Sequence, residues 1–134
     1  MSSLKKEAVT KNYSFGSNYL KYYTEYAEYV NGLKMTEQTK DWRLKHIRCF
    51  VSYMESHKMN LSKLKEEDLV KCIVESIKDV HGRTVNNRIL CFKYFLFFLR
   101  ENGVVNLSED EILSAIKTVR HLRKETNHKK ISQK

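Results

Sequence analysis

The segment 84–102 constrains the fold more than any other part of the chain, because it is apolar on almost every side of a helix. Its apolar residues are Val85, Ile89, Leu90, Phe92, Tyr94, Phe95, Leu96, Phe97, Phe98 and Leu99. Only Asn86, Lys93 and Arg100 recur at seven-residue spacing, as a narrow polar stripe. A helix of this kind belongs in the centre of a bundle, so we expect an all-α fold.

The composition favours long helices around this segment. The chain has no proline and four glycines in 134 residues, so the two strongest helix breakers are nearly missing. Gly32, Gly82 and Gly103 fall between the periodic segments, where helices are expected to stop. We predict a compact bundle of four to five helices, and the length suits a single domain.

Apolar residues that repeat every three or four positions give the expected bounds of each helix. The predicted helices cover residues 14–31, 36–57, 65–80, 84–102 and 108–124. Ser108 and Glu111 have the spacing of a capping box at the start of the last one. We expect one helical domain over 14–124, a flexible N-terminal tail over 1–13 and a basic flexible end over 125–134.

The distribution of charge suggests what kind of partner the chain binds. It has 25 Lys and Arg against 16 Asp and Glu, a net charge of +9 that attracts polyanions. Residues 65–81 hold three basic and five acidic side chains, whereas residues 82–103 hold four basic and one acidic. Residues 36–64 are also basic, with six positive and three negative side chains. A polyanion is therefore expected to meet the second and fourth helices and to avoid the third.

Basic and hydroxyl side chains gather at the starts of the second and fourth helices. Free backbone N–H groups and the helix dipole favour a phosphate at such a start, and these side chains add donors. The residues we expect to contact DNA are Thr39, Lys40, Arg43, Arg83, Thr84, Asn87, Arg88 and Lys93. Thr39 and Thr84 would alternatively serve only as N-caps, and the basic residues only as solvated edges.

Motifs in residues 36–105 resemble, in order and spacing, the core-binding domain of tyrosine recombinases of the phage-integrase type. In the second helix they are Thr39, Arg43, Ile47 and Phe50, and in the next segment Leu61, Leu64, Glu67, Asp68 and Leu69. In the fourth helix and after it they are Thr84, Asn86, Arg88, Phe95 and Gly103. The resemblance implies a SAM-like helical fold that grips recombination-site DNA, alongside other recombinase subunits on the same DNA.

In this family the chemistry belongs to a separate catalytic domain with a tyrosine nucleophile and a His-x-x-Arg element. The last tyrosine here is Tyr94, inside the fourth helix, and the residues that follow His121 do not match that element. We therefore expect a site-specific recombinase module that is not itself an enzyme and has no catalytic residues. No cofactor, metal, small-molecule substrate or membrane partner is expected either.

Two other functions remain open from the sequence. The tyrosines between residues 19 and 29 suit core packing, a docking surface or stacking on bases. They would serve a non-catalytic helical protein-interaction module of a phage or plasmid accessory protein, and an RNA binder would share the basic charge. His46 and Cys49 are too isolated for a zinc site. The odd number of cysteines and the absence of a signal peptide indicate a reducing cytoplasm.

Overall fold

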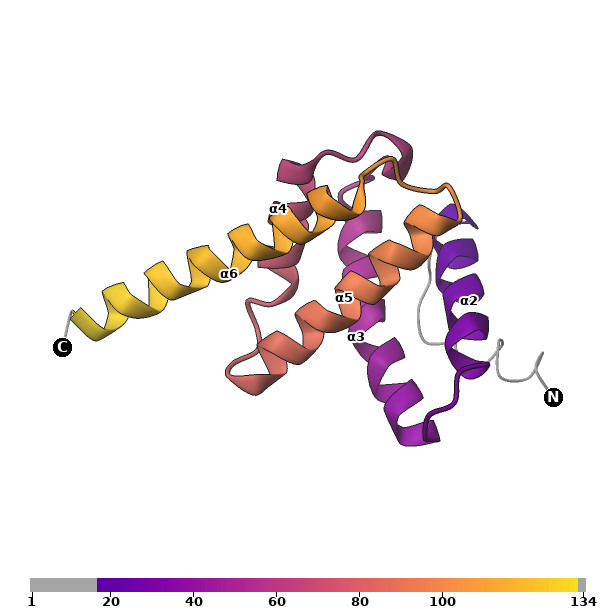
Figure 1. Ribbon diagram of the computed structural model, residues 1–134, viewed down its shortest axis with the longest axis horizontal. Coiled ribbons are helices and arrows are strands. Elements are labelled where there is room, and N and C mark those ends of the chain that lie inside the picture. The colour runs from indigo at the N-terminus through magenta and orange to yellow at the C-terminus, as the bar shows by residue number, and fades with distance from the viewer. Residues whose placement is uncertain (1–16, 133–134) are drawn as a thin grey trace. The chain divides into compact units, whose positions relative to one another are not determined.

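The computed structural model describes residues 17–132, and these form helices joined by short connections (Figure 1). The N-terminal unit, up to Met59, contains α2 (Ser17–Asn31) and α3 (Glu37–Ser56). The C-terminal unit, from Asn60 onward, contains a short 3₁₀ turn (Leu61–Lys63), α4 (Glu66–Ser76), α5 (Arg83–Glu101) and α6 (Glu109–Ser132). No strand occurs in residues 17–132, so the prediction of an all-α fold is confirmed.

The predicted tail at 1–13 lies outside the described residues. At the other end the structure differs from the prediction, because α6 continues to Ser132, past the stop expected near Lys124. The chain expected to form one domain over 14–124 divides into two compact units between Met59 and Asn60.

In the N-terminal unit, α2 packs against α3 through its tyrosine-rich face. Tyr23 and Tyr26 are buried, whereas Tyr29 is half exposed. The hydroxyl of Tyr19 donates a hydrogen bond to the carbonyl of Met59. Burial, and then the nearby Glu55 carboxylate, raise the pKa of Tyr19 above its usual value. Two tyrosines of the stripe therefore belong to the core, whereas Tyr29 leaves part of it at the surface.

The N-cap of α3 is Thr36. Its side-chain oxygen accepts a hydrogen bond of 3.2 Å from the backbone N–H of Thr39 and lies 2.8 Å from the Thr39 hydroxyl. Thr39, which the sequence suggested as a cap, is instead the third residue of the helix. This arrangement is a standard N-cap, because the cap oxygen satisfies one of the otherwise unpaired N–H groups of the first turn.

Replacing Thr36 with alanine is therefore expected to lower the free energy of unfolding by about 1 kcal/mol. Thr39→Ala removes only an exposed hydroxyl contact and is expected to cost less than about 0.5 kcal/mol. Urea denaturation followed by circular dichroism measures both values. An equal or larger loss for Thr39→Ala would contradict the assignment of the cap.

In the C-terminal unit, α6 lies against both α4 and α5 (Figure 1). It starts with the predicted capping box, in which Glu111 accepts from the Ser108 N–H and Ser108 accepts from the Glu111 N–H. Helix α6 buries Ile112, Ala115 and Val119. The predicted start of this helix is thus confirmed, because its capping residues determine where it begins.

Helix α5 provides more buried apolar residues than any other helix of its unit and ends where predicted. Phe92, Phe95 and Leu96 are fully buried, whereas Tyr94 is 38% exposed, so α5 is not covered on every side. Gly103 adopts a positive φ of 73° just after the helix. The N–H of Gly103 donates to the Arg100 carbonyl, and the N–H of Val104 donates to the Leu99 carbonyl. These two bonds form a Schellman motif, which favours glycine at this position.

Candidate nucleic-acid interface

Arg88, expected to contact DNA, instead lies inside the C-terminal unit. Its side chain is 8% exposed, and its Nη1 atom donates to the backbone carbonyl of Ser76 at 2.8 Å and to Oδ1 of Asp79 at 3.1 Å. Ser76 is the last residue of α4, so the guanidinium satisfies a carbonyl at the negative end of that helix. Arg88 is a capping residue, and the DNA contact predicted for it is withdrawn.

Helix α4 is shorter than predicted, because it ends at Ser76 and not at Val80. A continuing helix would pair the Ser76 carbonyl with the N–H of Val80, four residues later. In the structure that carbonyl accepts from Arg88, and the N–H of Val80 donates to Ile77. The donor that satisfies the freed carbonyl is thus twelve residues away in sequence, and periodicity cannot reveal it.

Lys40 has a similar role in the N-terminal unit. Its Nζ atom donates to the backbone carbonyl of Asn31 at 2.8 Å and lies 3.6 Å from Oε1 of Glu37. Asn31 is the last residue of α2, so Lys40 caps that helix and joins it to the start of α3. Because Lys40 is buried and engaged, the DNA contact predicted for it is also withdrawn. Arg43, one turn further along α3, is half-buried.

The first turn of α5 keeps the exposed groups that the sequence placed there. Arg83 and Thr84 are exposed and Asn87 is half-buried. The N-cap is Gly82, with a φ of 61°, and no side chain caps this turn. Thr84 is therefore the second helical residue and not the cap that its type suggested, and the helix starts two residues earlier than a cap at Thr84 implies.

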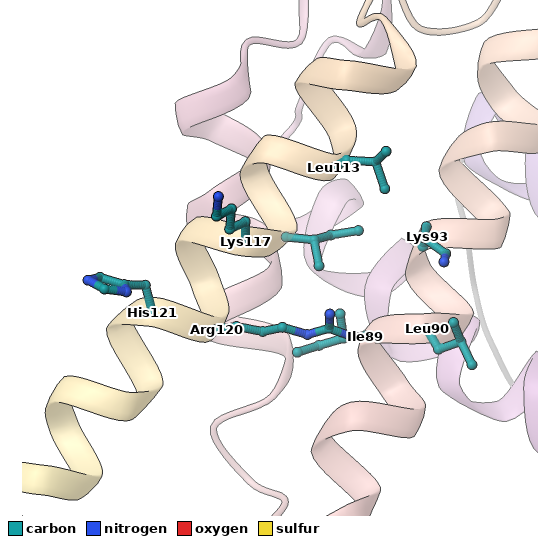
Figure 2. A pocket seen from close by; sticks show the side chains of 8 residues that line it. Ile89, Leu90, Lys93, Leu113, Lys117, Arg120 and His121 are labelled. Carbon is teal, nitrogen blue, oxygen red and sulfur yellow. The ribbon is translucent and has the colours of Figure 1, made fainter.

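A groove of about 460 Å³ lies between α5 and α6 (Figure 2). Its lining residues are Ile89, Leu90, Lys93, Leu113, Ile116, Lys117, Arg120 and His121. Arg120 extends from α6 toward Ile89 on α5, whereas Lys117 and His121 leave α6 on the side away from α5 (Figure 2). The lining thus combines four aliphatic side chains with three cations and a histidine, and none of these eight residues is acidic.

Sequence reasoning found only Lys93 among the groove cations. Lys117 and Arg120 are not among the residues that the sequence analysis expected to contact DNA. A signal was present, since Leu113, Ile116, Lys117 and Arg120 follow the helical spacing of three and four residues. That spacing places them on one face of a helix, but not against α5.

Other chemistries find little support in residues 17–132. No group of three His, Cys, Asp or Glu side chains within this part of the chain is placed to hold a metal ion. The His46 ring packs edge-on against Trp42, with ring centroids 4.8 Å apart. Burial raises the pKa of the Cys72 thiol far above its usual value, which makes it a poor nucleophile.

No protein-family model, curated protein or solved structure matches the chain. Among the described helices, none combines the length and the apolar character needed to cross a bilayer. The function is therefore inferred from the exposed groups described above and from the sequence resemblance in residues 36–105.

Proposed function

We propose that the chain binds duplex DNA as a core-binding module of the tyrosine-recombinase type. The observation that carries the proposal is the first turn of α5, where Arg83 and Thr84 are exposed and the N-cap residue, Gly82, has no side chain that could accept from the N–H groups. A helix start of this kind combines backbone N–H donors with the positive end of the dipole and an added guanidinium. It suits a phosphate of the DNA backbone.

The charge of the remaining chain supports the same partner. The net charge is +9, whereas α4 begins with Glu66, Glu67 and Asp68. DNA would approach the C-terminal unit from α5 and be repelled by the start of α4. Contacts of this kind position a protein on DNA without reading its sequence, because they reach phosphates rather than base edges.

In a recombinase, such a module would hold the recombination site while a separate catalytic domain performs strand exchange. Other recombinase subunits would occupy the same DNA. Tethering would raise the effective concentration of each domain for the DNA, so the module needs only weak affinity of its own. Non-specific affinities on the order of 10⁻⁴ to 10⁻⁶ M at physiological salt are typical of binding through phosphates.

Replacing Arg83 with glutamine is expected to weaken binding to a mixed-sequence DNA duplex by about tenfold, because one charge-assisted hydrogen bond is lost. The slope of log affinity against log salt should fall by about one. Fluorescence anisotropy titrations at several salt concentrations measure both quantities. The side chain is exposed, so the thermal midpoint should not change.

Lys71→Gln provides the matched control, because Lys71 is an exposed cation on the acidic helix α4 and the loss of charge is the same. It is expected to change the affinity less than twofold. Equal effects of the two substitutions would mean that net charge alone explains the binding and that the start of α5 is not a specific contact. A stronger preference for duplex RNA than for duplex DNA would favour the RNA-binding alternative.

A further inference from the structure

We propose that the groove between α5 and α6 holds one strand of the DNA backbone, with phosphates against Lys93 and Arg120 and sugars against the aliphatic floor. This inference rests on the proposed function, which identifies the bound polymer as DNA. It adds a second contact site, formed largely by residues of α6 that lie outside the resemblance over 36–105.

The chemistry of the groove matches that of a nucleic-acid strand. A strand alternates anionic phosphates with sugars whose carbon faces are apolar. The floor offers Ile89 and Leu90 from α5 and Leu113 and Ile116 from α6, with cations from both helices around it. A groove for an isolated anion would need no such floor. The mixed lining therefore favours a backbone strand over a free phosphate.

The groove cations are available, unlike Lys40 and Arg88. Lys117 and Arg120 are exposed, and Lys93 is half-buried with its Nζ atom 5.3 Å from the Tyr94 ring centroid. No carboxylate is among the lining residues to neutralise them. Cations that line a groove without a carboxylate create a positive field there, and this field attracts a polyanion.

The groove is separate from the contact proposed at the start of α5. Arg83 and Lys93 are ten residues apart on one helix, which corresponds to roughly 15 Å along its axis. A single phosphate cannot reach both. Each region should therefore contribute its own increment to affinity and to salt dependence.

Helix α6 carries two leucines that test the groove directly. Leu113 lines the groove and is 45% exposed, whereas Leu122 is 43% exposed and does not line it. Their nine-residue separation places them on opposite faces of the helix. Substituting either with glutamate changes the net charge equally, and neither substitution buries a charge in the core.

We expect Leu113→Glu to weaken binding to a mixed-sequence DNA duplex by about tenfold, because the new carboxylate faces the strand and opposes the cations. Leu122→Glu should change the affinity less than twofold.

A double substitution, Lys93→Gln with Arg120→Gln, should lower the slope of log affinity against log salt by about two. Its matched control is Lys71→Gln on α4 with Lys78→Gln just after that helix, since both side chains are exposed. Circular dichroism verifies that each variant is folded.

Equal affinities of the Leu113→Glu and Leu122→Glu variants would overturn the groove assignment. If Arg83→Gln still weakens binding in that case, the proposed function survives and only the groove is lost. Absence of salt-dependent DNA binding by the unmodified chain would remove both. Tighter binding of poly-glutamate than of duplex DNA, abolished by Leu113→Glu, would assign the groove to an acidic protein partner and overturn the proposal.

Discussion

Replacing Arg88 with alanine is expected to lower the free energy of unfolding by about 2–4 kcal/mol. The guanidinium is the partner of the Ser76 carbonyl, and the side chain is 8% exposed. Its removal leaves a buried carbonyl without that donor and opens a space between α4 and α5. The loss is a large fraction of the 5–15 kcal/mol that typically stabilises a domain.

The ion pair contributes the smaller part of this effect. The side chain of Asp79 is 75% exposed, so solvent screens its attraction to Arg88. We therefore expect Asp79→Asn to cost less than about 1 kcal/mol. Arg88→Lys should be intermediate, because an ammonium group lacks the planar fork of a guanidinium.

Arg83→Ala is the control for this substitution, because Arg83 is an exposed arginine five residues earlier on the same helix. Urea denaturation should show a change of less than about 0.5 kcal/mol for Arg83→Ala. DNA titrations should show the reverse order. Arg83→Ala should weaken the affinity for DNA, whereas Arg88→Ala should leave it unchanged in protein that remains folded. A stable Arg88→Ala variant with weakened DNA binding would contradict the capping role.

The fold could be predicted where local chemistry decides it. The Ser108–Glu111 capping box and the stop at Gly103 follow from neighbouring residues, and the structure has both. The end of α4 could not be predicted, because the carbonyl that it leaves without a helical partner is satisfied by Arg88 from another helix. The extension of α6 to Ser132 was also missed, since a polar, basic segment carries no strong periodic signal.

The candidate site was harder to predict for a related reason. A basic side chain near a helix start has the same sequence signature whether it binds a phosphate or caps a neighbouring helix. Lys40 and Arg88 reach the C-terminal carbonyls of α2 and α4, and only three-dimensional proximity reveals this. Conversely, Lys93 and Arg120 are 27 positions apart and share a groove only because α6 packs on α5.

Salt dependence is the second large effect that we expect. Arg83, Lys93 and Arg120 provide three cations on the proposed DNA-binding face of the C-terminal unit, and Lys117 is left out because it points away from α5 (Figure 2). If each of the three neutralises one phosphate, the slope of log affinity against log salt is about −2.7. Raising the salt concentration from about 50 to about 200 mM should then weaken binding about 40-fold. Contacts from the N-terminal unit would make this dependence steeper.

The most direct test of DNA binding is therefore a salt titration of the unmodified chain with a mixed-sequence duplex, followed by fluorescence anisotropy. Our account predicts a straight log–log plot with a slope of about −2.7 or steeper. It also predicts that the slope becomes shallower by about one in Arg83→Gln, and not in Lys71→Gln. A slope near zero, or an unmodified chain that does not bind duplex DNA even at low salt, would contradict the proposed function.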